Sequence, residues 1–293
     1  MKKVVSFGGR HLLTKKQLEE IGYLQRICEE EDSIQLRLNW DMLQTRAENE
    51  RNDLFYYQNG KLVGFIGLYG FKSQVELCGM VDPGFRRKGI FSKLFSEALL
   101  IIQERNFTKI LLNTPSNSLS AKEFLKSVSC TYSYSEYQMK WVETELTKDE
   151  DVLVRMATPR DFETEVMLDV LCFGEDEADA RDFTDRIKLE NLQQTYMIEK
   201  KGETVGKIRL SLINGQARIF GFAIFPKYQG KGIGRKALSK VVLRKQRAGY
   251  PIFLEVEAKN TNALKLYQSC GFRNLYSQDY YVFHEKSVAD LTQ

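Results

Sequence analysis

The chain has 293 residues, of which 43% are hydrophobic and 28% are charged. These values are ordinary for a globular protein, and the length predicts two domains. The net charge of +4 comes from 43 basic and 39 acidic residues. This balance does not indicate the clustered basic face that nucleic acid requires, so we expect no nucleic-acid partner.

Cysteine and histidine usage limits the chemistry further. The five Cys lie singly, at positions 28, 78, 130, 172 and 270, and no pair has metal-ligand spacing. We expect free or buried thiols in a reducing compartment. His11 and His284 are the only histidines, which disfavours a His-centred triad or a zinc site, and we expect no metal.

Targeting signals are weak along the chain. No apolar run approaches the ~18 residues of a membrane span, and the apolar part of residues 1–9 is too short for a signal peptide. We therefore expect a cytoplasmic protein without a membrane partner, present as a monomer or a homodimer.

In chain order, the first half is expected to open with a helix. Thr14-Lys15-Lys16-Gln17 forms a capping box. Two strands then flank Asn59-Gly60, a strong hairpin signal. A further strand, a Gly-containing loop, a helix, a strand, a short helix and a final aromatic strand follow. The first helix has its apolar face at Leu18, Ile21, Leu24 and Ile27, and the later elements are expected at residues 54–58, 61–68, 75–81, 91–103 and 109–113.

The second half repeats this order. Thr158-Pro159-Arg160-Asp161 opens a helix, with Pro159 at a tolerated first position. Strands are expected at residues 195–199, 204–210, 217–225 and 252–258, and a helix at 235–246. Each half is thus an α/β (α+β) domain with a mixed, mostly antiparallel central sheet flanked by helices.

A fixed offset relates the two halves. An offset of 143 residues aligns a series of residues in the same order, and an offset of 142 applies slightly upstream, which a one-residue loop difference explains. The run of matches predicts a duplicated domain. The pairs at 143 are Pro83/Pro226, Phe85/Tyr228, Gly89/Gly232, Ile90/Ile233, Asn117/Asn260, Phe124/Tyr267 and Tyr137/Tyr280, and those at 142 are Gly60/Gly202 and Gly64/Gly206.

An acidic segment separates the copies. Five of the nine residues 143–151 are acidic, and like charges that repel and hydrate are typical of a solvated linker. An exposed edge of either domain is the alternative. We place the domains at residues 1–142 and 152–293.

A Gly-rich loop stands before the main helix of the second half. Gly230, Gly232 and Gly234 allow the backbone to turn sharply and to approach a ligand closely. Their amides lie at a helix start, where the helix dipole favours anions. The spacing fits neither a Walker loop nor a dinucleotide-binding loop. The loop predicts a phosphate or pyrophosphate site, with a Gly-rich turn before a solvated basic helix as the alternative. The added positive charge comes from Lys231, Arg235 and Lys236.

Gln229-x-x-Gly232-x-Gly234 resembles the signature of the GNAT N-acetyltransferase superfamily. The resemblance covers the second half and, more weakly, the first. It implies that the loop amides hold the CoA pyrophosphate, that strand residues pair with the pantetheine arm, and that this strand splays from the next one. The residues it implies for acetyl-CoA binding are Phe222, Ala223, Ile224, Gln229, Gly230, Lys231, Gly232, Ile233, Gly234, Arg235 and Asn260.

The segment from Leu254 to Phe272 is especially similar to the ribosomal-protein alanine N-acetyltransferases, a likeness that implies Glu255 as base and Tyr267, twelve residues later, as acid. A carboxylate can take the proton that an amine must lose, and a Tyr hydroxyl can protonate the leaving thiolate. Glu257 shares the strand face of Glu255 and is the second candidate base. A solvent-facing Glu and a packed aromatic are the structural alternatives. The preceding strand, residues 217–225, has no carboxylate that could act as a base, and its only charged residue is Arg218.

The first copy lacks these groups at the 143 offset. Phe91 replaces Gly234, Leu112 replaces Glu255 and Phe124 replaces Tyr267. The first half is therefore expected to shape the acceptor site or to stabilise the chain, with Glu76 as a stray strand carboxylate.

We thus expect an acyltransferase that moves an acetyl group from acetyl-CoA to a primary amine of a small molecule or peptide. A non-catalytic acyl-CoA-binding sensor is the alternative. An aminoacyl-tRNA-dependent peptidyl transferase is disfavoured by the complete loop at 229–234. Acidic residues at 175–182 would attract a cationic amine, although a solvated charged loop is the simpler interpretation.

Overall fold

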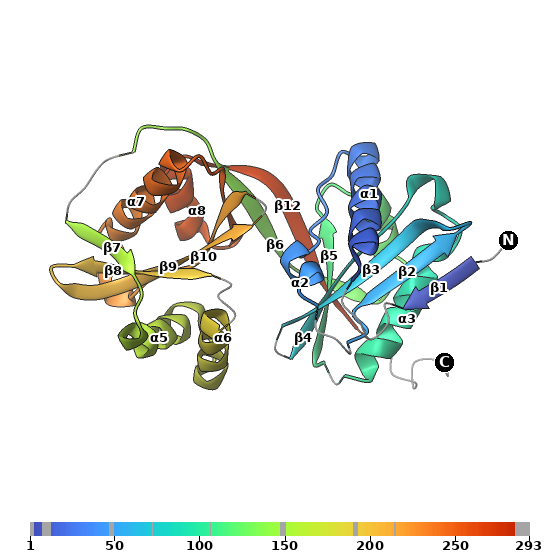
Figure 1. Ribbon diagram of the computed structural model, residues 1–293, viewed down its shortest axis with the longest axis horizontal. Coiled ribbons are helices and arrows are strands. Elements are labelled where there is room, and N and C mark those ends of the chain that lie inside the picture. Colours follow the sequence, from blue (N-terminus) through green and yellow to red (C-terminus); the bar gives the residue numbers. More distant parts are fainter. Residues whose placement is uncertain are drawn as a thin grey trace. The chain divides into compact units, whose positions relative to one another are not determined.

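The computed structural model describes residues 3–7, 13–46, 50–71, 73–105, 107–146, 151–189, 193–213 and 215–284, with backbone alone for 3–7 and 71. His11 and part of the expected linker, residues 147–150, lie outside the described residues. The chain forms two compact units, here named unit 1 and unit 2 (Figure 1). Unit 1 comprises Met1–Ser135 and Tyr276–Gln293, and unit 2 comprises Glu136–Leu275.

Unit 1 is built on a mixed sheet with the strand order β1-β2-β3-β4-β5-β12. β4 and β5 are parallel, and the other neighbouring pairs in this order are antiparallel. Its elements are β1 (Lys3–Phe7), α1 (Lys15–Asp32), α2 (Trp40–Gln44), β2 (Asp53–Gln58), β3 (Lys61–Phe71), β4 (Gln74–Val81), α3 (Ile90–Gln103), β5 (Lys109–Pro115), α4 (Leu119–Leu125), the first part of β6 (Cys130–Trp141) and most of β12 (Phe272–Phe283).

Alternation along these strands gives the sheet two apolar faces. Leu54 and Ile66 pack with α3, whereas Phe55 and Phe65 pack with α1. Side chains of successive strand residues point to opposite faces, so both faces need a helical cover. The mixed sheet is therefore covered by helices on each side.

Unit 2 repeats this arrangement with the strand order β6-β11-β10-β9-β8-β7. β10 and β11 are parallel, and the other neighbouring pairs are antiparallel. Its elements are β7 (Val152–Met156), α5 (Phe162–Phe173), α6 (Glu177–Leu189), β8 (Gln194–Lys200), β9 (Glu203–Ile213), β10 (Gln216–Ile224), α7 (Ile233–Arg247), β11 (Ile252–Glu257) and α8 (Thr261–Ser269). No helix in the described part of the chain is both long and apolar enough to cross a membrane.

The last strand of each half completes the sheet of the other. β6 follows α4 in the first half but pairs with β11, as Gln138 does with Glu255. β12 ends the second half but pairs with β5, as Tyr280 does with Asn113. The compact units therefore differ from the sequence halves at 1–142 and 152–293 by an exchange of closing strands.

The local signals for turns and caps are confirmed. Thr14 makes the reciprocal capping box at the start of α1. Asn59 and Gly60 have φ values of 52° and 77°, the left-handed pair that the hairpin requires. The expectation of a charged loop at 175–182 is wrong in part, because α6 begins at Glu177 with the side chain of Asp176 accepting from the backbone N–H of Ala178 at 2.9 Å.

Candidate active site

The parallel strands β10 and β11 separate in the middle of unit 2. Their pairing runs from Ala217↔Ile252 to Ile219↔Leu254, and no pair between them follows it. Glu255 is thus the first residue of β11 beyond the paired segment, and β10 continues beside β9 alone. The splay expected from the family resemblance is present, and it opens a gap between two strands that elsewhere hydrogen-bond.

A β-bulge lies in β10 at this gap. The register of β10 against β9 shifts between Phe220 and Ala223, and Gly221 between them has φ = 47°. A Cβ on Gly221 would collide with the guanidinium of Arg209, and a Cβ on Gly206 would collide with the carbonyl oxygen of Ala223. Glycine is needed at both positions because backbone and side chains approach so closely.

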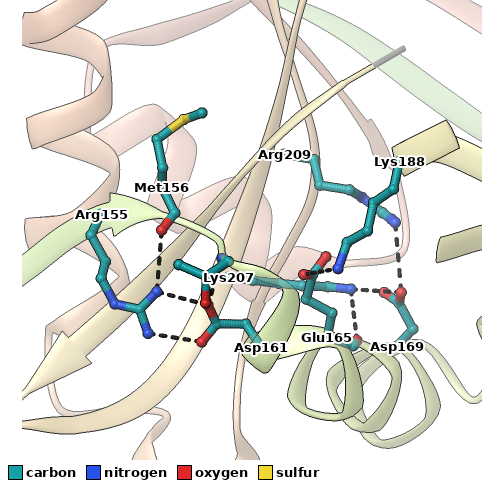
Figure 2. Close-up of polar contacts among 9 residues, drawn as sticks. Arg155, Met156, Asp161, Glu165, Asp169, Lys188, Lys207 and Arg209 are labelled. Atoms are coloured by element: carbon teal, nitrogen blue, oxygen red, sulfur yellow. Dashed lines mark hydrogen bonds and ion pairs between the residues drawn. The ribbon is translucent and has the colours of Figure 1, made fainter. Parts of the chain in front are cut away.

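Buried charges lie on the face of β9 next to this bulge (Figure 2). Lys207 Nζ donates to Asp169 Oδ2 at 2.6 Å and to the carbonyl of Glu165 at 2.8 Å, and Arg209 Nη1 lies 3.6 Å from Asp169 Oδ2. The side chains of Lys207 and Asp169 are fully buried. Burial, followed by the Arg209 charge, lowers the pKa of Lys207 to about 8. We name Asp169, Lys207 and Arg209 the buried ion cluster.

Sequence reasoning missed this cluster. Lys207 and Arg209 are two residues apart, which places them on one face of the strand. Long charged side chains at inward-facing positions of a strand are rarely fully buried unless they are paired. Asp169, in the helix that covers this face, was the signal that could have identified the pair.

The Gly-rich loop joins the bulged strand to α7. Gly230 and Gly232 have φ values of 72° and 73°, and a Cβ on either would meet open space, so their conformation rather than packing requires glycine. Gly232 is the N-cap of α7, and the first amides of a helix have no intrahelical acceptor. Amides in this position, together with the helix dipole, are suited to an anion.

The expected loop side chains partly serve the loop itself. Gln229 Nε2 donates to the Ile224 carbonyl at 2.8 Å, and Lys231 Nζ donates to the Lys227 carbonyl at 2.8 Å. The Sγ of Cys172 also contacts the Ile224 carbonyl, at 3.4 Å. The Ile224 carbonyl is therefore already engaged by side chains. Ile233, a further residue of the expected set, is buried in the core below α7.

Tyr267 lies in an apolar setting beside the loop. Its side chain is buried, and its ring centroid is 6.5 Å from that of Phe222 and 6.1 Å from that of Phe272. Burial raises the pKa of Tyr267 to about 12. A Cβ on Gly234 would lie 3.5 Å from the Phe222 ring, an ordinary contact. The loop, the bulge and Tyr267 therefore pack against one another.

Glu255 faces the opposite side of β11. Leu254 and Val256 belong to the core that contains Tyr267, so Glu255 between them points to the other face. Glu255 Oε1 lies 3.6 Å from Arg218 Nη1 and accepts from Gln138 Nε2 at 3.4 Å. Arg218 is thus a partner of the expected base, a role that its sequence position alone did not indicate.

The two other expected polar residues have local partners. Asn260 is the N-cap of α8, and its Oδ1 accepts from the backbone N–H of Ala263 at 3.1 Å. Its amide nitrogen can still donate to a ligand. Glu257 shares the face of Glu255, as expected, and forms an ion pair with Lys259 at 2.8 Å.

The structure corrects the residue offset between the halves. The extra residue of the second half lies in the β10 bulge and not in a loop. β9 aligns with β3 at an offset of 142 throughout their paired segments, whereas β10 aligns with β4 at 142 before the bulge and at 143 after it. The pairs Leu77↔Leu112 and Ile219↔Leu254 return the offset to 142 in β5 and β11.

Different residues consequently replace the acid and base in unit 1. Asn113 occupies the position of Glu255, and Leu125 occupies that of Tyr267. The helix N-caps agree, since Ser118 in α4 matches Asn260 in α8. The assignments of Leu112 and Phe124 from the 143 offset were wrong.

The loop conformation is nevertheless preserved in unit 1. Arg87 and Gly89 have φ values of 59° and 74°, close to those of Gly230 and Gly232. β4 pairs with β3 continuously and without a bulge. Phe91, at the position of Gly234, packs edge-on against Phe124 at 4.6 Å. Unit 1 keeps this loop conformation but fills the space beside the loop with aromatic rings.

These features define a tandem protein of the GNAT acetyltransferase fold. The acetyltransferase (GNAT) family model matches residues 18–128 and 161–272. The chain belongs to this family, and both halves carry the match.

Curated relatives share only part of their length with this chain. The [ribosomal protein bS18]-alanine N-acetyltransferase of Escherichia coli K12 is 30% identical over 78 residues, which are 26% of this chain and 53% of the relative. That of Haemophilus ducreyi is 36% identical over 61 residues, 20% of this chain and 42% of the relative. The chain thus spans about half the length of the curated relatives it matches.

Solved structures match nearly the whole chain. A GCN5-related N-acetyltransferase from Sphaerobacter thermophilus has a TM-score of 0.78 at 16% identity and covers 96% of this chain and 95% of its own. A tandem GNAT protein from the clavulanic acid biosynthesis pathway has a TM-score of 0.70 at 13% identity, covering 98% and 100%. At these identities the likeness establishes the tandem fold.

Proposed function

We propose that unit 2 transfers the acetyl group of acetyl-CoA to a primary amine by direct attack. The observation that carries the proposal is the convergence of four features on one gap. The splayed strands, the β10 bulge and the loop at residues 229–234 lie around it, and the side chains of Glu255 and Tyr267 lie beside it on opposite faces of β11. The corresponding positions of unit 1 lack the bulge, the carboxylate and the hydroxyl.

The proposed acetyl-CoA position follows from the groups that unit 2 offers. The amides of Gly232, Ile233 and Gly234 suit the pyrophosphate, with positive charge from Arg235 nearby. The backbone of the bulge at Phe222 and Ala223 faces the gap, which suits the amide-bearing pantetheine arm. The amide nitrogen of Asn260 can donate to the same arm.

Glu255 is proposed as the base. An ammonium must lose a proton before its nitrogen can attack the thioester carbonyl carbon, and the carboxylate can take that proton directly or through a water molecule. The contacts to Arg218 and Gln138 fix the position of the carboxylate at the start of the gap. A fixed base near the reacting atoms lowers the entropy lost on reaching the transition state.

Tyr267 is proposed as the acid. Attack of the amine forms a C–N bond and a tetrahedral centre, and its collapse breaks the C–S bond and leaves the CoA thiolate. The Tyr267 hydroxyl supplies a proton to this sulfur, and the extra proton on the new amide nitrogen leaves through water and restores the Tyr267 hydroxyl. A pKa of about 12 suits this role because the hydroxyl stays protonated at neutral pH.

The acceptor is proposed to be the amine of a peptide or small molecule in the cytoplasm. The curated relatives act, by their names, on an alanine of ribosomal protein bS18, which supports an α-amino group as the class to test first. The protein is proposed to act as a monomer or homodimer.

The proposal is tested by two substitutions in unit 2. Tyr267→Phe and Glu255→Gln should each lower kcat by about 10²- to 10⁴-fold, the usual contribution of a general acid or base. Thiol release with acetyl-CoA and a panel of peptide amines measures this loss. Tyr196→Phe, another buried tyrosine of the same core, is the matched control. Full turnover in Tyr267→Phe would refute the assignment of the acid, and full turnover in Glu255→Gln combined with loss in Glu257→Gln would move the base to Glu257.

A further inference from the structure

The face of the unit 2 sheet that carries Glu255 has its charges arranged in order along the strands. Side chains of alternate residues share a face, so Phe253, Glu255 and Glu257 of β11 lie together. Glu257 lies opposite Glu136 of β6. At the other end of this run, Phe253 lies opposite Lys140. The proposed base therefore stands between a pair of carboxylates and a lysine.

Arg218 of β10 adds a second cation at the lysine end of this face. It lies beside Phe253 in the parallel pairing of β10 and β11. Arg218 Cζ is 5.7 Å from the centre of the Phe253 ring, and Lys140 Nζ is 5.9 Å from the same centre. Cation–π attraction to one ring thus holds both cations there. Since Arg218 Nη1 lies 3.6 Å from Glu255 Oε1, a guanidinium and a carboxylate stand side by side at the start of the gap.

A ligand can reach both members of this pair. The Arg218 side chain is 30% exposed, and the Glu255 side chain is 19% exposed. Arg209, which shares this face of the sheet, is instead buried against the bulge. A guanidinium has five N–H donors, more than its contacts to Glu255 and Gln216 require. Arg218 can therefore bind an anion of a ligand while it keeps its contact to Glu255.

The pair matches a ligand that carries the two opposite charges on adjacent groups. An α-amino acid is such a ligand, because one carbon atom bears both its ammonium and its carboxylate. With the ammonium toward Glu255 and the carboxylate toward Arg218, each charge meets its opposite, and a guanidinium suits the planar carboxylate. Lys140 adds positive potential at the carboxylate end. A peptide amine has a neutral carbonyl group at this place, and a polyamine has no anion at all.

We propose that the acceptor of unit 2 is a free α-amino acid, whose carboxylate is bound by Arg218 while its amine is directed to Glu255. This proposal rests on the acetyl transfer proposed for unit 2. The amine nitrogen forms the C–N bond, the C–S bond of acetyl-CoA breaks, and the products are an N-acetylamino acid and CoA. Arg218 determines specificity, because it binds the part of the acceptor that does not react.

The test compares α-amino acids with their own amides, in thiol-release kinetics with acetyl-CoA and the full chain. An amide keeps the amine and the side chain but loses the negative charge. The kcat/KM of the best amino acid should exceed that of its amide by about 10- to 100-fold, the usual effect of a hydrogen bond to a charged group. Arg218→Gln should abolish this ratio, and Arg218→Lys should retain part of it. If Arg218 only positions Glu255, both acceptors will lose activity equally and the ratio will stay.

Arg247→Gln is the matched control, because Arg247 lies at the end of α7, the helix that covers the other face of the sheet. Circular dichroism verifies folding, and the ratio of the unsubstituted chain tests the proposal even where a variant does not fold. A ratio near one in that chain, or an unchanged ratio in Arg218→Gln, would overturn the free amino acid as acceptor and leave acetyl transfer by unit 2 intact. Absence of thiol release with every amino acid, amide and peptide would contradict the transfer itself and this proposal with it.

Discussion

The β3–β4 hairpin of unit 1 and the β9–β10 hairpin of unit 2 have the same register near their turns and differ farther along the strands. β4 pairs with β3 without interruption, whereas β10 contains one additional residue at a bulge. The positions equivalent to Lys207 and Arg209 are Phe65 and Gly67 of β3, and unit 1 has a different buried ion pair beside them, Arg46 with Asp53 at 2.9 Å. The two copies therefore differ in backbone register and in the residues that carry buried charge, and in unit 2 the bulge and the buried ion cluster both lie beside the proposed reaction gap.

In unit 2, the buried ion cluster and the bulge form one structural unit. Arg209 packs against the bulge glycine, so the charge and the bulge support each other. In unit 1, where β4 has no bulge, a Cβ on Gly67 would collide with the hydroxyl of Tyr69, and the guanidinium of Arg46 lies 4.8 Å from the centre of the Tyr69 ring.

The largest effect is expected from removing the carboxylate of the cluster. Asp169→Ala leaves Lys207 and Arg209 buried without their counter-ion, a change that typically costs about 3–5 kcal/mol. Urea unfolding of the purified chain measures the loss. Asp151→Ala removes an exposed partner of Lys236 and should cost less than about 1 kcal/mol. Equal losses of unfolding free energy in the two variants would show that the buried ion cluster stabilises the protein no more than an exposed ion pair does.

Removing the bulge should affect catalysis next. Deletion of Gly221 gives β10 the continuous register of β4 and moves the residues that border the gap. We expect kcat/KM to fall about 10²-fold or more, since small displacements near reacting groups have effects of that size. Steady-state kinetics with acetyl-CoA measures it, with circular dichroism as the folding control. A folded deletion variant with undiminished kcat/KM would contradict the role of the bulge.

A smaller change should follow from copying the aromatic residue of unit 1 into unit 2. Gly234→Phe introduces into unit 2 the residue type that unit 1 has at the equivalent position, Phe91. In unit 2 we expect overpacking of about 1–3 kcal/mol, which corresponds to roughly a 10- to 100-fold rise in the KM for acetyl-CoA. Gly234→Ala should have a much smaller effect, because a Cβ there lies 3.4 Å from Leu266, an ordinary contact. Similar KM values for the two variants would exclude side-chain size as the discriminating property.

The smallest effect concerns pH. The pKa of Tyr267 is raised to about 12, above the usual value of a tyrosine, so its hydroxyl keeps its proton throughout the range in which the enzyme is assayed. We expect no alkaline decline in kcat from this group below about pH 11. A kcat–pH profile measured to pH 10.5 tests this expectation. A decline centred near pH 9 that is absent from the residual activity of Tyr267→Phe would contradict it.

Much of the fold could be predicted because its signals are local. The hairpin at Asn59-Gly60, the capping box at Thr14 and the Gly-rich loop each depend on the conformational preferences of a few adjacent residues. The same loop predicts an anion site and distinguishes the half that carries the complete motif, and the anion site remains a prediction. Individual roles for Glu255 and Tyr267 remain predictions that the proposed substitutions test.

The register of the repeat could not be predicted in this way. Asn117 with Asn260 and Phe124 with Tyr267 match in type at an offset of 143, yet the helix N-caps Ser118 and Asn260 align at 142. A bulge inserts one residue without any turn residue that marks a loop. The buried ion cluster was missed for a related reason, because its partners come from different elements.

The exchange of closing strands was also beyond the sequence pattern. Residues 130–141 and 272–283 form strands of equal length, each rich in aromatic residues. Either could complete either sheet by its alternation alone. Only the pairing of Gln138 with Glu255 and of Asn113 with Tyr280 distinguishes them.

This exchange of closing strands affects the order in which the two sheets can be completed during synthesis. During synthesis β12 follows every strand of unit 2, so the sheet of unit 1 is complete only after residues 276–283 have been made, although most of unit 1 is made first. Unit 2 instead finds β6 already present when β11 emerges. Long-range pairing of this kind slows folding. Each half by itself lacks the strand that completes its own sheet, because β6 pairs with β11 and β12 pairs with β5.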